Sequence, residues 1–290
     1  MASLREIRRK IKSVKSTEQI TKAMKMIAAA RMRRAQASIL SSRPFAARME
    51  EAVRDLAALD ASPGVDFEHP FFQPGPAGAA ECLILVTADK GLCGAFNTNV
   101  LKAGIEWLRA RQGKPVMLAC VGRKARDFAA RLKGINVLCE LVGIFPRASY
   151  AHAEILGQAV SGAFLEGRSR SVTAIFNEFR SVLSQRVVER PLLPIPVPEK
   201  AAKAADFRFE PEREQLLAAL LPRHLKAQLY RILLESQAAE LAARMNAMDS
   251  ASRNARELID ALTLNLNRTR QSLITLEITE LVGGAEALSN

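Results

Sequence analysis

Glycine and proline are missing from both ends of this 290-residue chain. Residues 1–43 and 223–282 contain neither residue type, and 13 of the 15 glycines lie between positions 64 and 167. Because glycine and proline are the main helix breakers, both ends are free to form long uninterrupted helices. At 1.5 Å per residue, residues 223–282 would extend about 90 Å, far more than a compact domain requires. The two ends therefore predict a rod.

Other absences exclude whole classes of protein. No apolar run approaches the roughly 18–20 residues that span a bilayer, and the N-terminal stretch lacks the apolar centre of a secretory signal. The four cysteines, Cys82, Cys93, Cys120 and Cys139, have no zinc-site spacing, and the three histidines are scattered. We expect buried free thiols in a reducing compartment, and neither a metal ion nor a cofactor.

Acidic residues are scarce in one segment, which holds nearly all of the net charge of +12. Residues 1–48 contain 13 lysines and arginines against only Glu6 and Glu18. Such a helix could neutralise nucleic-acid phosphates, or it could face an acidic protein surface. Residues 1–44 contain no Phe, Tyr or Trp to stack on bases, and no zinc-finger, helix-turn-helix or basic-zipper layout surrounds them. These observations favour a protein partner, and a basic coiled-coil nucleic-acid-binding protein remains the alternative.

A narrow apolar stripe follows the C-terminal segment in alternating steps of three and four residues. Its members are Met245, Met248, Ser252, Ala255, Ile259, Leu262, Leu266, Thr269, Leu273 and Leu276. Two positions in seven are typical of a coiled coil rather than of a helix that covers a globular core. The N-terminal segment keeps the same spacing at Leu4, Ile7, Ile11 and Val14, and then shifts to Ile20, Met24 and Ile27, which indicates a local stutter. We expect the two ends to pair antiparallel, with pairing to other subunits as the alternative.

The middle of the chain predicts an α/β domain. Apolar stretches that read as strands ("CLILVTAD", "KPVMLACVG", "SVTAIFNEF", "SQRVVERPLLPI") alternate with stretches that read as helices. This alternation favours a mainly parallel sheet. The predicted organisation is an N-terminal helix over 1–62, a linker over 63–79, an α/β domain over 80–198, a return segment over 199–222 and a C-terminal helix over 223–290. The fold class is α/β, a long antiparallel coiled coil with an inserted Rossmann-like domain.

One segment, "TADKGLCGAFN" at 87–97, resembles a ligand-binding loop because it follows a strand and opens a helix. Gly91 and Gly94 give only G-x-x-G, which is neither a phosphate-binding P-loop nor a dinucleotide turn. Asp89 could be catalytic, but no histidine, cysteine–base pair or second carboxylate accompanies it in the segment. We therefore expect a tight structural turn here.

Five stretches give the chain a family resemblance that covers nearly its whole length. They are "IRRKIKSVKSTEQITKAMKMIAAARMRRAQ", "TADKGLCGAFN", "IFNEFRSVLSQ", "ESQAAELAARMNAMDSASRNA" and "SLITLEITELVGGAEAL". Their order and positions resemble the gamma subunits of F-type ATP synthases. The resemblance implies that the terminal helices form the central shaft of a rotary motor, inside a ring of alpha and beta subunits. It implies that the α/β domain lies at the foot, against the epsilon subunit and the c-ring.

The resemblance also implies contact residues and a location. Met24, Arg244, Gln271 and Thr275 match positions where the family's shaft meets the beta subunits or packs its own helices near them. The chain would have no catalytic residue of its own, would bind no nucleic acid and would reach the membrane only through the complex. No closely spaced extra cysteine pair is present, and the first motif begins close to the first residue. We therefore expect a bacterial protein on the cytoplasmic side of the inner membrane.

Overall fold

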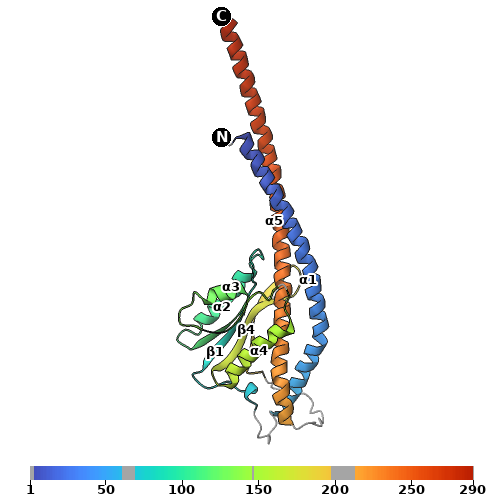
Figure 1. Ribbon diagram of the computed structural model, residues 1–290, viewed down its shortest axis with the longest axis vertical. Helices are drawn as coiled ribbons and strands as arrows, with labels where there is room; N and C mark the ends of the chain where they lie inside the picture. Colours follow the sequence, from blue (N-terminus) through green and yellow to red (C-terminus); the bar gives the residue numbers. More distant parts are fainter. Residues whose placement is uncertain (1–2, 61–68, 146, 197–212, 290) are drawn as a thin grey trace. The chain divides into compact units, whose positions relative to one another are not determined.

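The computed structural model describes residues 3–60, 69–145, 147–196 and 213–289. Two long helices form the ends of the chain: α1 (Leu4–Asp60, 57 residues) and α5 (Arg213–Ser289, 77 residues). The prediction of two long terminal helices is confirmed (Figure 1). The chain divides into two compact units: Met1–Ala28 with Met245–Asn290, and Ala29–Arg244.

The start of α5 differs from the predicted boundary at residue 223. The helix begins at Arg213 and includes Pro222, although proline in a helix interior costs about 3 kcal/mol. Leu217, Leu221 and Leu225 are buried on both sides of the proline, and burial of each leucine contributes roughly 1.5–3 kcal/mol. Packing therefore outweighs the lost hydrogen bond. Residues 63–68 of the predicted linker (63–79) and residues 199–212 of the predicted return segment (199–222) lie outside the described residues.

The α/β domain contains one five-stranded sheet in the order β3-β2-β1-β4-β5. The strands are β1 (Ala80–Val86), β2 (Val116–Val121), β3 (Asn136–Leu141), β4 (Ser169–Phe179) and β5 (Gln185–Leu193). The helices are the short 3-10 helix η1 (Pro70–Phe72), α2 (Phe96–Arg109), α3 (Arg123–Ala129) and α4 (Tyr150–Leu165). All strand pairs are parallel except β4 with β5. The predicted α/β class with a mainly parallel sheet is confirmed.

Sequence reasoning missed the edge strand β3. Asn136 and Glu140 are exposed, the three residues between them are half-buried, and only Leu141 is buried. The strand is therefore less apolar than β1 or β2. Those two strands are buried on both faces, so their sequences are nearly continuous apolar runs, which made them recognisable. An edge strand with one neighbour lacks that signal.

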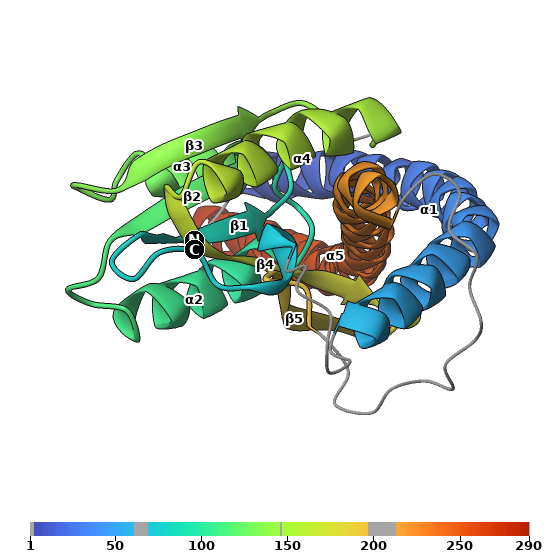
Figure 2. The same cartoon turned by 90° about the horizontal axis from the view of Figure 1, so that it is seen from below.

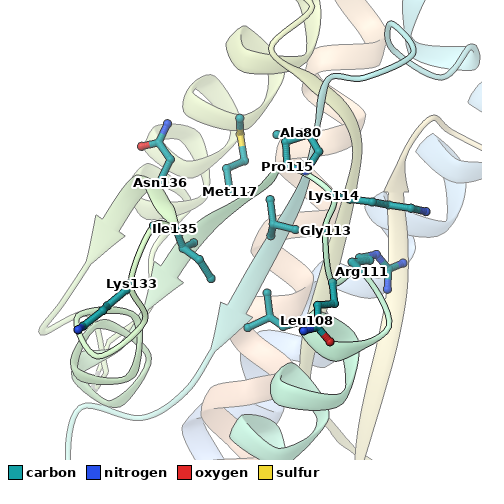
Figure 3. Close-up of a pocket in the computed structure, with 13 residues that line it drawn as sticks. Ala80, Leu108, Arg111, Gly113, Lys114, Pro115, Met117, Lys133, Ile135 and Asn136 are labelled. Atoms are coloured by element: carbon teal, nitrogen blue, oxygen red, sulfur yellow. The ribbon is translucent and has the colours of Figure 1, made fainter.

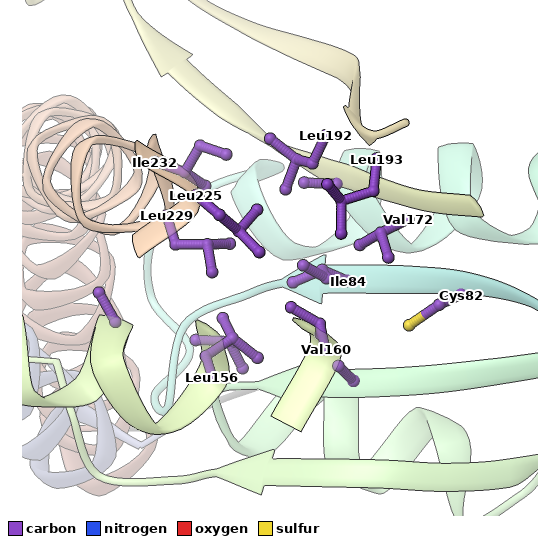
Figure 4. Close-up of a cluster of buried hydrophobic side chains, with 14 of the residues drawn as sticks. Cys82, Ile84, Leu156, Val160, Val172, Leu192, Leu193, Leu225, Leu229 and Ile232 are labelled. Atoms are coloured by element: carbon purple, nitrogen blue, oxygen red, sulfur yellow. The ribbon is translucent and has the colours of Figure 1, made fainter. Parts of the chain in front are cut away.

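The two faces of the sheet carry two separate apolar clusters. In β1, Leu83 and Leu85 face α2 and α3, where they meet Val100 and Trp107. Cys82, Ile84 and Val86 point to the opposite face, toward α4 and α5. Figure 4 shows this second cluster, in which Ile84 lies near Leu156 and Val160 of α4 and Leu225 and Leu229 of α5. Because successive side chains of a strand point to opposite faces, alternate residues of β1 pack into the two different clusters.

The first part of α5 is a core helix of the α/β domain. The buried residues that it contributes to the cluster are Leu217, Leu221, Leu225, Leu229, Ile232 and Leu233. It lies beside α4 (Figure 2), and the two helices approach closely at Gly157, where an added Cβ would stand 2.7 Å from Cγ of Lys226. The domain therefore holds α5 through an extensive apolar contact.

Gly122 supplies a stability test of the turn between β2 and α3. Its φ of 86° and ψ of 151° suit glycine alone, and an added Cβ would lie 2.2 Å from the carbonyl oxygen of Thr87. Gly122→Ala should lower the free energy of unfolding by about 2–3 kcal/mol. Gly94→Ala is the matched control: its φ is also positive, but nothing lies within 4 Å of the added Cβ, so we expect a smaller loss of about 1 kcal/mol. Urea unfolding followed by Trp107 fluorescence measures both variants, and equal losses would contradict the steric argument.

Candidate functional site

The predicted stripe on α5 forms the contact face of the unit built from the two helix ends. Met248, Ala255 and Ile259 are buried, and the remaining stripe positions up to Thr269 are half-buried. In Figure 1 the first part of α1 lies along this stretch and runs in the opposite direction. The antiparallel pairing predicted from heptad spacing is confirmed for Met245–Thr269. Leu273 and Leu276, the last two stripe positions, are exposed, so the pairing ends before them.

The predicted stutter in α1 is wrong. Ile20 and Ile27 are exposed by 57% and 53%, so they do not belong to the contact face. After Val14 the three–four spacing continues through Glu18, Thr21, Lys25 and Ala28, all of which are buried or half-buried. These positions escaped notice because polar and small residues replace the large apolar ones.

Local contacts explain how polar residues occupy the contact face of α1. The Thr21 hydroxyl donates to the carbonyl oxygens of Thr17 and Glu18, at 3.0 Å each. The hydroxyl therefore keeps hydrogen-bond partners although the side chain is buried. Lys25 Nζ donates to Oδ1 of Asp249 on α5 at 2.5 Å. This hydrogen bond lowers the pKa of the Asp249 carboxyl below its usual value. Met24, a predicted contact residue, is half-buried beside Lys25.

The Lys25–Asp249 pair gives a test of helix register. Lys25→Asp should bring two carboxylates together and Asp249→Lys two ammonium groups, so each single variant should melt at a lower temperature than wild type. The double variant restores opposite charges and should recover most of the loss. Because the Asp249 pKa is depressed in the folded state, the wild-type advantage should be lost as pH falls through the acidic range. Thermal melts of the four proteins test the pairing, and additive losses would contradict it.

The last part of α5 is a helix without a neighbour among the described residues. Every described side chain from 271 to 285 is exposed. They include six large apolar residues: Leu273, Ile274, Leu276, Ile278, Leu281 and Val282. Gln271 and Thr275, two more predicted contact residues, are exposed on adjacent turns, and the Thr275 hydroxyl donates to the Gln271 carbonyl oxygen at 3.0 Å. Exposed apolar side chains gathered on one helix are typical of a surface that binds a partner.

Arg244, the fourth predicted contact residue, is engaged within the α/β unit. Its Nη1 donates to the carbonyl oxygen of Gly91 at 2.8 Å, while Nε and Nη2 both donate to Oε1 of Glu240. Both side chains are largely buried, at 14% and 8% exposed. Burial raises the pKa of Glu240, and the charge of Arg244 opposes that rise. Arg244 therefore joins α5 to the 87–97 loop.

The 87–97 loop is a structural turn around Asp89. The Asp89 carboxylate accepts three backbone hydrogen bonds from two other segments: from the N–H of Arg123 at 3.0 Å, and from those of Gly143 at 2.8 Å and Phe145 at 3.2 Å in the loop after β3. Leu92 and Gly94 have positive φ angles, as a tight turn requires. The geometry assigns Asp89 to loop positioning, in agreement with the expected structural turn.

The usual ligand position of a doubly wound sheet is filled by protein. Such sheets bind ligands at the carboxyl ends of the strands where the strand order reverses, which here is between β1 and β4. Ala88, Cys93 and Phe96 pack there against Ala239 of α5. Asn177 at the end of β4 donates to the Phe96 carbonyl oxygen at 3.2 Å. A nucleotide would have to displace α5 from this position.

Comparisons with known proteins agree with the two-helix architecture. The family model described as ATP synthase matches residues 3–288. The ATP synthase gamma chain of Elusimicrobium minutum is 44% identical over 302 residues, covering 100% of both chains. This chain belongs to the ATP synthase gamma chain family. The gamma chain of Anaeromyxobacter sp. (strain Fw109-5) is also 44% identical, covering 99% of this chain and 100% of that one.

Solved structures of the family's assemblies have the same fold. A chain from the central stalk and c-ring of the Tetrahymena thermophila mitochondrial ATP synthase is 25% identical, with a TM-score of 0.61, and covers 80% of this chain and 99% of that chain. A chain from the Euglena gracilis enzyme gives a TM-score of 0.69 at 18% identity, over 98% and 94% of the two chains. No helix among the described residues is long and apolar enough to cross a bilayer.

Sequence reasoning missed both ion pairs of the site. The Glu240–Arg244 spacing of four residues on one helix was a recognisable signal. The Lys25–Asp249 pair and the Arg244–Gly91 hydrogen bond join residues far apart in the chain, which no local pattern connects.

Proposed function

We propose that this chain is the central rotor of an F-type ATP synthase, which couples ion flow through the c-ring to conformational changes at the beta-subunit catalytic sites. The similarity to gamma chains over the full length supports this proposal most strongly. The heptad-spaced pairing of α1 with α5 agrees with it, because two paired helices resist bending and twisting better than one.

The proposal assigns a partner to each exposed surface. The alpha and beta subunits would surround the exposed apolar end of α5, where Gln271 and Thr275 lie, and the epsilon subunit and c-ring would contact the α/β domain. The exposed basic side chains of α1 would face acidic loops of the surrounding subunits, near Met24. Arg244 would act by fixing the 87–97 loop to the shaft. The complex would lie at the cytoplasmic face of a bacterial inner membrane, with this chain outside the bilayer.

The proposed mechanism needs no catalytic group on this chain. One asymmetric pair of helices contacts the beta subunits differently at any moment, and it can shift each beta subunit only by that difference in contact free energy. Each charge that crosses about 100 mV releases about 2.3 kcal/mol, so several ion steps must accumulate for one ATP. The rod has to store and transmit this energy. The nucleic-acid alternative receives no support from the relatives, which are ATP synthase gamma chains.

Assembly with catalytic subunits tests the proposal. We expect co-expression with the alpha and beta chains of the same genome to give a stable complex. The three chains should elute together on gel filtration, and the eluted complex should hydrolyse ATP. A chain that ends at residue 270 lacks the exposed apolar end of α5 and should form a complex that dissociates more readily. Failure of the full chain to elute with alpha and beta would refute the rotor assignment.

A further inference from the structure

A pocket of about 610 Å³ opens at the amino ends of three parallel strands. The strands are β1, β2 and β3, whose first residues help to line it, together with the end of α2 and the turn before β3. This edge of the sheet is opposite to the carboxyl ends that carry the 87–97 loop. Volumes of this size are typical of small-molecule sites.

The pocket combines an apolar floor with a cationic rim. Leu108, Met117 and Ile135 line its interior. Figure 3 shows Lys133 on one side and Lys114 and Arg111 on the other, with Ile135 and Met117 between them. The lining residues include three cations and no carboxylate. An occupant therefore needs an apolar body and a negative charge.

Arg111 is held rigidly at the rim. Its Nε donates to Oε2 of Glu81 at 2.6 Å, and Cζ lies 3.8 Å from the centroid of the Trp107 ring. Lys114 Nζ is 3.9 Å from the other Glu81 oxygen and has an exposed side chain. Glu81 is thus shared by Arg111 and Lys114, and with Lys133 on the other side the rim keeps a net positive charge.

Two glycine turns fix the positions of these lysines. Gly113, next to Lys114, has a φ of 86°, and Gly134, next to Lys133, has a φ of 77°. Backbone of this kind is accessible to glycine and disfavoured for other residues. The two ammonium groups are therefore carried on defined turns on opposite sides of the apolar floor.

We propose that this pocket binds a small organic anion, with its apolar body on the floor and its anionic group at the cationic rim to which Lys114 and Lys133 contribute. The inference depends only on the α/β domain and holds whether or not the chain is a rotor. Soluble organic acids and anionic lipids share this chemistry.

The dye anilinonaphthalene sulfonate is a suitable probe because it joins a sulfonate to aromatic rings. Trp107 is the only tryptophan, and its ring contacts Arg111 of the pocket. Energy transfer from Trp107 to the dye therefore favours dye that is bound near the pocket. Titration of the full chain should give a saturable signal that weakens with added salt.

Two matched variants separate this site from general dye binding. Lys114→Gln/Lys133→Gln should weaken dye affinity roughly three- to tenfold, because each exposed cation contributes modestly. Lys90→Gln/Lys124→Gln removes the same charge at the other edge of the sheet and should leave the affinity unchanged. Neutral phenylnaphthylamine should bind more weakly than the dye to the wild type. Equal dye affinity in the two double variants, or equal binding of the neutral compound, would overturn the proposal.

Vesicles distinguish the two sources of the anion. Flotation with phosphatidylglycerol vesicles that requires Lys114 and Lys133, and does not occur with phosphatidylcholine, would support the site with a lipid as its source. Dye binding without flotation would support it with a soluble acid as its source. Flotation that persists in the Lys114→Gln/Lys133→Gln variant, together with unchanged dye binding, would overturn it.

Discussion

Replacing Ile259 by proline should uncouple ATP hydrolysis from ion transport in the assembled synthase. Ile259 is a buried member of the α5 contact face, near the middle of its pairing with α1. Proline there removes the hydrogen bond to the carbonyl of Ala255 and clashes with that turn, at a cost of about 3 kcal/mol or more. The resulting kink should absorb torque as bending. Catalytic groups in the beta subunits remain, so some hydrolysis should survive while ion transport falls much further.

The same membranes should be used for both measurements, ATP-driven ion uptake and ATPase rate. Ile259→Ala is the matched control, because it removes the same packing but leaves the backbone hydrogen bonds intact. We expect the ratio of uptake to hydrolysis to fall strongly for Ile259→Pro and only slightly for Ile259→Ala. If both variants assemble and give the same ratio, α5 does not transmit torque through this segment.

Replacing Arg244 by alanine should destabilise the α/β domain by about 3–5 kcal/mol at neutral pH, because it leaves the Glu240 carboxylate buried without its charge partner. It also frees the Gly91 carbonyl and so the 87–97 loop. The loss should appear in urea unfolding followed by Trp107 fluorescence. Glu240→Gln in the Arg244→Ala background removes the buried charge and should recover much of the stability.

The pH dependence of this variant has a defined sign. Burial already raises the pKa of Glu240, and removal of Arg244 should raise it further. A raised folded-state pKa means that the folded protein binds the proton more tightly, so the variant loses stability as pH rises from the ordinary glutamate range through the raised value. The deficit relative to wild type should therefore be smaller at about pH 5 than at neutral pH. Arg253→Ala, which breaks an exposed ion pair with Asp249, should change stability little at either pH.

Much of the architecture was predictable because each element has its own periodicity. The absence of glycine and proline predicted the long helices, and the three–four spacing from Met245 to Thr269 identified the face of α5 that contacts α1. The apolar runs of β1 and β2 identified the sheet because both of their faces are buried.

The failures occurred where packing, rather than composition, decides the outcome. Thr21 and Ala28 carry the α1 contact face while the more apolar Ile20 and Ile27 remain exposed, so a hydrophobic pattern alone chose the wrong positions. Pro222 lies inside a helix because buried leucines on both sides hold it there. Local sequence preferences favour some conformations over others, and tertiary contacts can override these preferences.

Candidate contact residues were harder to assign than the fold. Gln271 and Thr275 are exposed, as residues that touch a partner should be, but so is every other described side chain from 271 to 285. Arg244 is instead buried in contacts within its own domain, with Gly91 and Glu240. A surface that functions only in an assembly leaves little trace in one chain's own contacts.

Rotation of this chain within the assembled head tests the rotor proposal most directly. The complex would be held to a surface through its alpha or beta subunits, and a bead would be attached to the α/β domain at an introduced Arg109→Cys, since Arg109 is exposed whereas three of the native cysteines are buried and one is half-buried. We expect added ATP to drive the bead in one direction continuously, and Ile259→Pro to reduce the torque on it. A bead that stays still while the same complexes hydrolyse ATP would contradict the account.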